Sequence, residues 1–260
     1  MQVPIYQVDA FTNKLFGGNY AAVCPLDEWL SEETMQLIAA ENNLPETAFI
    51  VKEAEGYKIR WFTPVVEVPL CGHATLAAAH VFFNHLNVKD AEISFQSMSG
   101  MLKVSKKNKL LTLDFPVDSY ESVSTPDFLV KAFGIIPKQA LKGSMDYMLV
   151  FENEEQITNA NPDLSLIANA DARGVIITAP GKDVDFVSRF FGPQSGIPED
   201  PVTGSAHTLL TPYWHEKTGK TDFNAIQLSK RKGHLHCVLK GGRVEISGEA
   251  VTYLVGSITV

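Results

Sequence analysis

Alternating apolar and polar positions predict strands along much of the chain. Residues Pro4 to Ala10, Thr47 to Val51 and Tyr57 to Phe62 follow the two-residue period of a strand. Between the first two, Ser31 is placed to cap an amphipathic helix that runs to about Asn43. Strands that alternate with helices in this way favour an α/β or α+β fold.

Two segments are predicted to be buried helices. From His73 to Phe83 the residues are apolar on almost every side, and a helix without a polar face must be enclosed by other elements, here strands. A second helix is predicted to open at Gly204 and reach about Lys217, with a kink at Pro212. Each half of the chain would then contain one such helix.

Both predicted helices follow a short polar turn with a glycine at its hinge. The first turn is Leu70 to Thr75 and the second is Glu199 to His207. The first amides of a helix lack partners within it, so such a start attracts an anion, for example a carboxylate. Two similar starts predict one small acidic substrate held between two related lobes.

An internal repeat supports this division. Arg60 to Pro64 matches Arg189 to Pro193, and Gly72 matches Gly204 when three extra residues are allowed in the second loop. The copies are about 130 residues apart, which is too long for a solenoid and favours duplicated domains. We expect lobes at 1–116 and 117–249, with a strand near 250–260 returning to the first lobe and the active site in the cleft between them. In the second lobe, Ala140 to Phe151 is predicted to form one strand.

Composition excludes several classes of protein. Apolar residues make up 45 % of the 260 and charged residues 20 %, which is ordinary for a soluble globular protein, and the net charge of −8 argues against nucleic-acid binding. Three cysteines favour a reducing compartment. Neither a signal peptide nor an apolar run long enough to span a membrane is visible, so we expect a cytoplasmic protein without membrane or nucleic-acid partners.

Three polar residues are candidates for chemistry, and each also has a plain structural interpretation. His73 is either a helix-start residue bonded to its own backbone or a general acid/base at the mouth of a buried helix. Asp200 either initiates a turn or holds a substrate amine or hydroxyl. Glu46 is either a surface carboxylate or, among Leu44 and Phe49, a desolvated group suited to proton transfer.

The residues next to Gly72 and Gly204 limit the reactions that the site could catalyse. Ser205 could cap its helix, bind substrate, or do both. Cys71 precedes Gly72, whereas Thr203 stands at the equivalent place before Gly204. One thiol and one threonine cannot form the cysteine pair of a two-base racemase. No metal or nucleotide motif is visible, and the remaining cysteines, Cys24 and Cys237, are expected to be small buried hydrophobic residues.

Several long motifs in fixed order resemble the phenazine-biosynthesis isomerase (PhzF-like) family, within the diaminopimelate-epimerase-like superfamily. The resemblance runs nearly end to end, through Val8 to Thr12, Phe16 to Asn19, Asn43 to Phe49, Arg60 to Pro64, Cys71 to Thr75 and Glu199 to His207.

The resemblance implies two pseudo-symmetric lobes, each a sheet rolled around a central helix. It also implies that Glu46 is the catalytic glutamate, accompanied by His73 and Asp200, and that Gly72 and Ser205 line the substrate site. Members of the family are commonly homodimers and act without a cofactor or metal. Pro45 stands where many relatives carry serine.

We therefore expect a cofactor-independent isomerase that transfers an allylic proton on a small carboxylate-bearing metabolite, with cyclic compounds among the candidates. Glu46 would move the proton, His73 and Asp200 would assist, and the helix starts with Thr203, Gly204 and Ser205 would bind the substrate. One alternative is a cofactor-independent amino-acid epimerase that depends on Cys71. Another is a small-molecule-binding protein that keeps the cleft without turnover.

Overall fold

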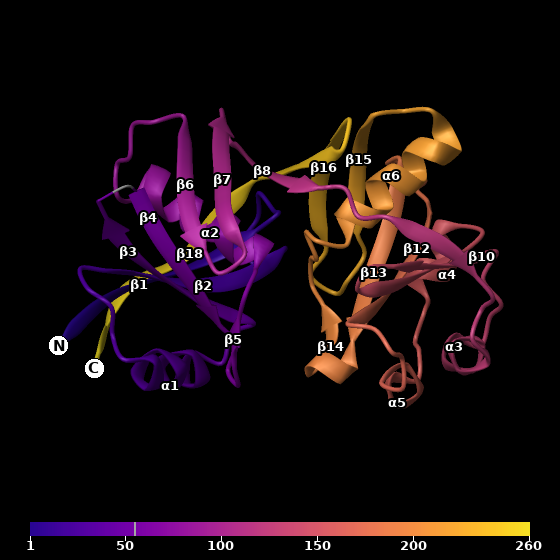
Figure 1. The fold of residues 1–260 in the computed structure, drawn as a ribbon, viewed down its shortest axis with the longest axis horizontal. Coiled ribbons are helices and arrows are strands. Elements are labelled where there is room, and N and C mark those ends of the chain that lie inside the picture. Colours follow the sequence, from indigo (N-terminus) through magenta and orange to yellow (C-terminus); the bar gives the residue numbers. More distant parts are fainter. Residues whose placement is uncertain (55) are drawn as a thin grey trace. The chain divides into compact units, whose positions relative to one another are not determined.

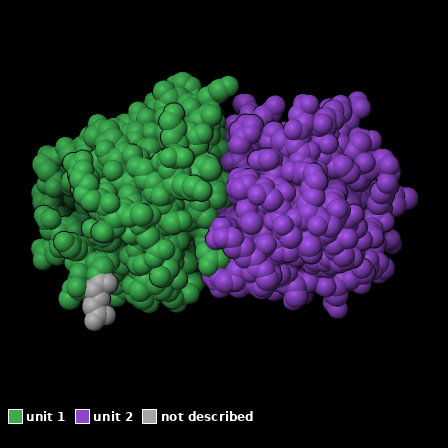
Figure 2. All heavy atoms as spheres, turned by 90° about the horizontal axis from the view of Figure 1, so that it is seen from above, with its two compact units in different colours: residues 1–114, 247–260 green, residues 115–246 purple. Residues whose placement is uncertain are grey.

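The chain folds into two units in a computed structural model that describes residues 1–54 and 56–260. Unit 1 comprises residues 1–114 and 247–260, and unit 2 comprises residues 115–246. Figure 2 colours the first green and the second purple. The mixed α/β fold with two pseudo-symmetric lobes that the sequence predicts is confirmed.

Unit 1 is a strongly curved sheet with two helices (Figure 1). Its strands are β1 (Gln2–Ala10), β2 (Asn19–Leu26), β3 (Glu46–Glu53), β4 (Gly56–Phe62), β5 (Glu67–Val68), β6 (Glu92–Ser97), β7 (Gly100–Lys107), β8 (Leu110–Pro116) and β18 (Ala250–Thr259). Its helices are α1 (Glu32–Asn42) and α2 (Gly72–Asn84). The last strand, β18, pairs antiparallel with β1, so both ends of the chain belong to this unit.

Unit 2 repeats the plan with additional short helices. Its strands are β9 (Tyr120–Val123), β10 (Gln139–Gly143), β11 (Asp146–Val150), β12 (Gly174–Pro180), β13 (Phe186–Gly192), β14 (Ile197–Asp200), β15 (Asp222–Gln227), β16 (Gly233–Lys240) and β17 (Arg243–Gly248). Its helices are α3 (Asp127–Phe133), α4 (Glu154–Thr158), α5 (Leu164–Ile167), the short 3₁₀ helix η1 (Pro193–Ser195) and α6 (His207–Thr218).

The helix α2 forms the centre of unit 1. Ten of its 13 residues are buried, and it packs against β1, β2, β3 and β18. Its alanine-rich surface allows strands to approach closely, and Phe82 adds edge-to-face contacts with Tyr57 and Phe95. The prediction of a buried helix from the all-round apolar pattern is therefore confirmed.

Strand pairing shows the repeat directly. In unit 1, β2 and β3 are parallel, β3 and β4 antiparallel, and β4 and β6 parallel. In unit 2, β11 and β12 are parallel, β12 and β13 antiparallel, and β13 and β15 parallel. The two copies therefore share one order of strand directions around one central helix each.

Two ion pairs occupy matching places in the copies. Arg60 of β4 donates from Nε to Glu67 of β5 at 2.7 Å, and Arg189 of β13 donates from Nε to Glu199 of β14 at the same distance. Each arginine ties a long strand to the short strand that leads into a helix start. Both turns preceding the helices are thereby fixed to the sheet.

Two details of unit 2 differ from the sequence-based predictions. The single strand expected from Ala140 to Phe151 is a hairpin, because the chain turns between Gly143 and Asp146. The helix expected from Gly204 begins at His207, after a turn. The predicted end of this helix near Lys217 is confirmed, since α6 continues through Pro212 to Thr218, and the kink at Pro212 stays a prediction.

Candidate active site

Glu46 is the first residue of β3, at a point where the chain turns sharply out of α1. Asn43 ends α1 in the left-handed conformation with φ of 48°, and Pro45 directs the next residue into the sheet. Glu46 then pairs in register with Ala21 of the parallel strand β2. The residue is only 8 % exposed, so this carboxylate is buried rather than on the surface.

His73, the second residue of α2, lies against Glu46. Its Nε2 atom is 3.0 Å from Glu46 Oε2, and the imidazole is 6 % exposed. On the other side of the ring, Nδ1 is 3.2 Å from Asn19 Nδ2 and 3.5 Å from Cys71 Sγ. The histidine is therefore held by side chains from β2, β3 and the helix start, and a bond to its own backbone is not what fixes it.

The contact between His73 and Glu46 leaves hydrogen-bonding capacity unused. Nε2 and Oε2 are close, but neither atom has a hydrogen-bond partner of good geometry among the described groups. A buried polar atom without such a bond costs roughly 1–3 kcal/mol. The pair is therefore an electrostatic contact that a third group, such as a substrate atom, would complete.

The electrostatic surroundings favour a protonated imidazole. Burial by itself lowers the pKa of His73, but the sulfur of Cys71 and the carboxylate of Glu46 outweigh it, so that the pKa lies well above its usual value. Burial, followed by Glu46, raises the pKa of the Cys71 thiol. With the thiol largely protonated near neutral pH, the charge that lies closest to His73 is the carboxylate of Glu46.

The same three side chains could hold a metal ion. One ligand atom each from Glu46, Cys71 and His73 lies within 4.8 Å of the other two, and all three residues are buried. A zinc ion bound by oxygen, sulfur and nitrogen at about 2.0–2.3 Å would require these atoms to move closer together. The set is a possible ligand group as well as an acid–base pair.

In unit 2, the predicted residues Asp200 and Thr203 form one network with Gln227. The Thr203 hydroxyl donates to Asp200 Oδ2 at 2.5 Å, and the Thr203 amide donates to Gln227 Oε1 at 2.9 Å. Gln227 in turn donates to the Asp200 carbonyl at 2.8 Å. Thr203 and Gln227 are buried, so the turn before α6 is rigidly held.

Ser205 does not cap α6. The N-cap is Ala206, whose methyl group cannot accept a hydrogen bond, and the Ser205 hydroxyl instead accepts one from Arg173 Nη1 at 2.9 Å. Arg173 also donates from Nε to Asp146 Oδ1 at 3.0 Å and from Nη2 to Asp146 Oδ2. Substrate binding, rather than capping, is the role left open for Ser205.

The predicted residues fall into two groups, one in each unit. Glu46, Gly72 and His73 are brought together in unit 1, with Gly72 as the first residue of α2. The second group belongs to unit 2 and comprises Asp200, Thr203, Gly204 and Ser205.

Sequence reasoning gave no role to three residues that hold these groups in place: Asn19, Arg173 and Gln227. Asn19 ends a Gly-Gly-Asn run at the start of β2, which was a detectable signal. Arg173 immediately precedes the strand β12, and Gln227 ends the strand β15. Nothing in the local pattern around either one distinguishes it from other polar residues at strand ends.

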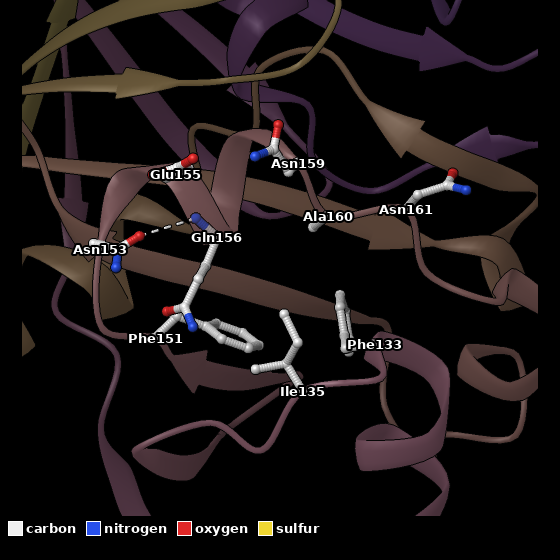
Figure 3. A pocket seen from close by; sticks show the side chains of 9 residues that line it. All are labelled: Phe133, Ile135, Phe151, Asn153, Glu155, Gln156, Asn159, Ala160 and Asn161. Carbon is white, nitrogen blue, oxygen red and sulfur yellow. Dashed lines mark hydrogen bonds between the residues drawn. The ribbon is translucent and has the colours of Figure 1, made fainter.

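Two pockets lie away from these groups. Figure 3 shows one of about 400 Å³ in unit 2, where apolar side chains face polar ones across the opening. It is lined by Phe133, Ile135, Phe151, Asn153, Glu155, Gln156, Asn159, Ala160 and Asn161. The other, of about 670 Å³ in unit 1, includes Lys14, Lys106 and Lys109. Neither contains a predicted site residue.

The remaining cysteines fit the sequence-based expectation. Cys24 and Cys237 are buried, and desolvation raises the pKa of each thiol to about 12. Among the described residues, no helix has both the length and the apolar character needed to cross a bilayer.

Comparison with known proteins agrees with the fold and the motifs. Residues 8–256 match the family described as phenazine biosynthesis-like protein. A protein of Pseudomonas aeruginosa described as an uncharacterized isomerase is 48 % identical over 258 residues, which cover 99 % of both chains. The crystal structure of a PhzF-family phenazine biosynthesis protein from Enterococcus faecalis has a TM-score of 0.98, 46 % identity and 100 % coverage of both chains.

A more distant structure shares the fold alone. A hydroxyproline epimerase from Agrobacterium vitis, solved with bound trans-4-hydroxy-L-proline, has a TM-score of 0.65 at 10 % identity, covering 99 % of this chain and 92 % of that one. The architecture is therefore that of the epimerase and racemase folds. The chain belongs to the phenazine biosynthesis-like (PhzF) family, and it is an isomerase.

Proposed function

We propose that the enzyme isomerises a small carboxylate-bearing metabolite by cofactor-independent proton transfer, with Glu46 as the base. The observation that carries this proposal is the buried contact of Glu46 Oε2 with His73 Nε2, in which neither atom makes a well-directed hydrogen bond to a described group. Substrate binding next to these atoms would use capacity that is costly to leave unused.

The reaction follows from the protonation states. The Glu46 carboxylate takes a proton from an allylic carbon, the electron pair of the broken C–H bond forms a new double bond to the next carbon, and the pair of the former double bond moves to the far carbon. The proton returns at the far carbon of the allylic system, so that no atom is gained or lost. His73, whose pKa is raised, stays protonated and supports the negative charge that develops on the substrate.

The thiol is not the base in this proposal. Because burial and Glu46 raise the pKa of Cys71, little thiolate is present near pH 7. An epimerase that uses Cys71 would need that thiolate. The further expectation that Asp200 assists the same substrate stays a prediction, which Asp200→Asn would test through the exchange reaction below.

Solvent deuterium provides the decisive experiment. The enzyme is incubated in D₂O with a panel of unsaturated cyclic carboxylates and amino acids, and label on carbon is followed by NMR. We expect label at allylic positions of one or more cyclic carboxylates, and a loss of roughly 10²–10⁴-fold in Glu46→Gln. Glu53→Gln, an exposed change at the other end of β3, serves as the matched control.

Each alternative gives a different result. Full exchange in a folded Glu46→Gln variant would refute the assignment of the base. Label at the α-carbon of an amino acid with loss of activity in Cys71→Ser would identify an epimerase. Binding without any exchange across the panel would identify a binding protein.

A further inference from the structure

The starts of the strands β3 and β12 are equivalent positions in the repeat. Thr47 pairs with Phe62 in unit 1, and Val175 pairs with Phe191 in unit 2. Since Arg60 to Pro64 matches Arg189 to Pro193, Thr47 corresponds to Val175. One residue earlier, Glu46 therefore corresponds to Gly174.

The helix starts extend the same correspondence. Gly72 matches Gly204, so His73 matches Ser205. In unit 1 the helix-start residue contacts a carboxylate from the strand start, Glu46, at 3.0 Å. In unit 2 the helix-start residue accepts a hydrogen bond of 2.9 Å from a guanidinium at the strand start, that of Arg173. An acid–base pair in one copy is replaced by a cation–hydroxyl pair in the other.

The arginine is fixed before any ligand arrives. Asp146, which is 4 % exposed, binds it through both carboxylate oxygens. Its guanidinium carbon lies 5.2 Å from the centre of the Phe190 ring. Gly174 leaves room for this ring, since a Cβ there would be 2.2 Å from Phe190 Cζ. The guanidinium of Arg173 is thus held by the Asp146 carboxylate and the Phe190 ring, and its backbone directly precedes the strand β12.

This arrangement determines what the Ser205 hydroxyl can do. Its oxygen accepts from a cation, and its hydrogen donates to no acceptor among the described residues. Ser205 is only partly buried, so a ligand can reach that hydrogen. A hydroxyl that accepts a charge-assisted bond is polarised and becomes a stronger donor to an anion.

We propose that Arg173 is a positioning residue that directs the Ser205 hydroxyl toward a carboxylate group, and that this pair makes unit 2 select carboxylates over neutral isosteres. The identification of that carboxylate as part of the reacting substrate rests on the proposed function. Binding of a carboxylate by Arg173 and Ser205 does not rest on the proposed function, and it can be measured separately.

Benzoate and benzamide are suitable probes because they have the same shape and differ in charge. Their dissociation constants are measured by NMR titration for the wild type, Arg173→Met, Arg173→Lys and Ser205→Ala. We expect the wild type to favour benzoate, and Arg173→Met to lose about tenfold in benzoate affinity, about 1.4 kcal/mol, with benzamide unchanged. Arg173→Lys should recover part of this loss, since it restores the charge without the planar fork. Lys142→Met, another cation of unit 2, is the control.

A double-mutant cycle separates positioning from general structural damage. Because both residues act through one hydroxyl, Arg173→Met with Ser205→Ala should cost no more than the larger single loss. Additive losses, equal losses for both probes, unchanged benzoate affinity, or no preference for benzoate in the wild type would overturn the proposal. If Arg173→Met fails to fold, Ser205→Ala and Arg173→Lys still give the probe comparison. Deuterium exchange in Glu46→Gln tests the base, whereas the benzoate titrations test Arg173 and Ser205, so the failure of either proposal can be recognised separately.

Discussion

The two copies of the repeat use the same backbone for opposite chemistry. At the start of its central strand, unit 1 places a carboxylate, Glu46, against an imidazole, His73. The corresponding place in unit 2 has Gly174, and the neighbouring Arg173 reaches the hydroxyl of Ser205. A carboxylate beside a protonated imidazole can move a proton, whereas a guanidinium beside a hydroxyl can only bind. If both proposals hold, duplication left one reactive copy and one binding copy.

The largest effect is expected when the imidazole is removed. His73→Asn should reduce deuterium exchange by roughly 10²–10⁴-fold, because the developing charge loses its cation. In the wild type, the raised pKa of His73 predicts that activity persists well above pH 6.5 and falls as this group loses its proton. That alkaline fall should be missing from the residual activity of the variant. A pH–rate profile from pH 5 to pH 10 measures both, and an unchanged alkaline fall would contradict this role.

A second prediction concerns Thr75 and His207, which occupy equivalent positions near the starts of the two central helices, and of which only the histidine can bind a proton. Thr75 and His207 each donate to the carbonyl four residues earlier, at 2.5 and 2.9 Å. Burial lowers the pKa of His207 to about 4. The unfolded chain therefore binds a proton that the folded chain does not between about pH 6.5 and 4, and up to about 3 kcal/mol of stability should be lost on acidification through that range.

His207→Asn keeps the donor and removes the titration. Urea unfolding at pH 7 and pH 4 should show a smaller acid loss in this variant than in the wild type. The exposed His234→Asn is the control and should leave the acid loss unchanged. Equal acid losses in the wild type and His207→Asn would show that His207 does not set the acid sensitivity.

A third prediction tests why unit 2 has a glycine, Gly174, at the position where unit 1 has Glu46. Gly174→Ala places a Cβ against the buried ring of Phe190 and should cost about 1–3 kcal/mol in free energy of unfolding. Gly242→Ala, where the added Cβ meets nothing within 4 Å, should change stability by less than about 0.5 kcal/mol. Chemical denaturation compares the two, and equal effects would remove the packing reason for glycine.

The smallest effect should distinguish the two matching ion pairs. Arg60 has a second carboxylate, Glu32, at 3.0 Å, whereas the other acceptors of Arg189 among the described residues, besides Glu199, are the carbonyls of Ile157 and Ala160. Glu199→Gln should therefore destabilise more than Glu67→Gln, by about 1 kcal/mol, because it leaves a cation with neutral partners. A larger loss in Glu67→Gln would reverse this ranking.

Local pattern was sufficient for the elements whose surroundings are uniform. The helix α2 is apolar on all sides, so burial followed from the sequence, and Ser31 caps α1 through the Thr34 amide as the sequence predicts. Where polar and apolar residues mix, the prediction failed. The hairpin between Gly143 and Asp146 was taken for one strand, and α6 was started three residues too early.

The sequence by itself determined the repeat, the two glycine turns and the presence of Glu46 and His73, because these depend on residues close together in the chain or on matching segments. Only the tertiary structure decided that Glu46 and His73 are in contact, and that Asn19 and Cys71 lie against the other side of the His73 ring. It also decided that the Ser205 hydroxyl bonds to Arg173 and does not cap its own helix. Except for the contact with Cys71, these contacts join residues that are separated by 27 or more positions in the sequence. Strand register sets such distances, and register arises from packing of the whole sheet rather than from any local stretch.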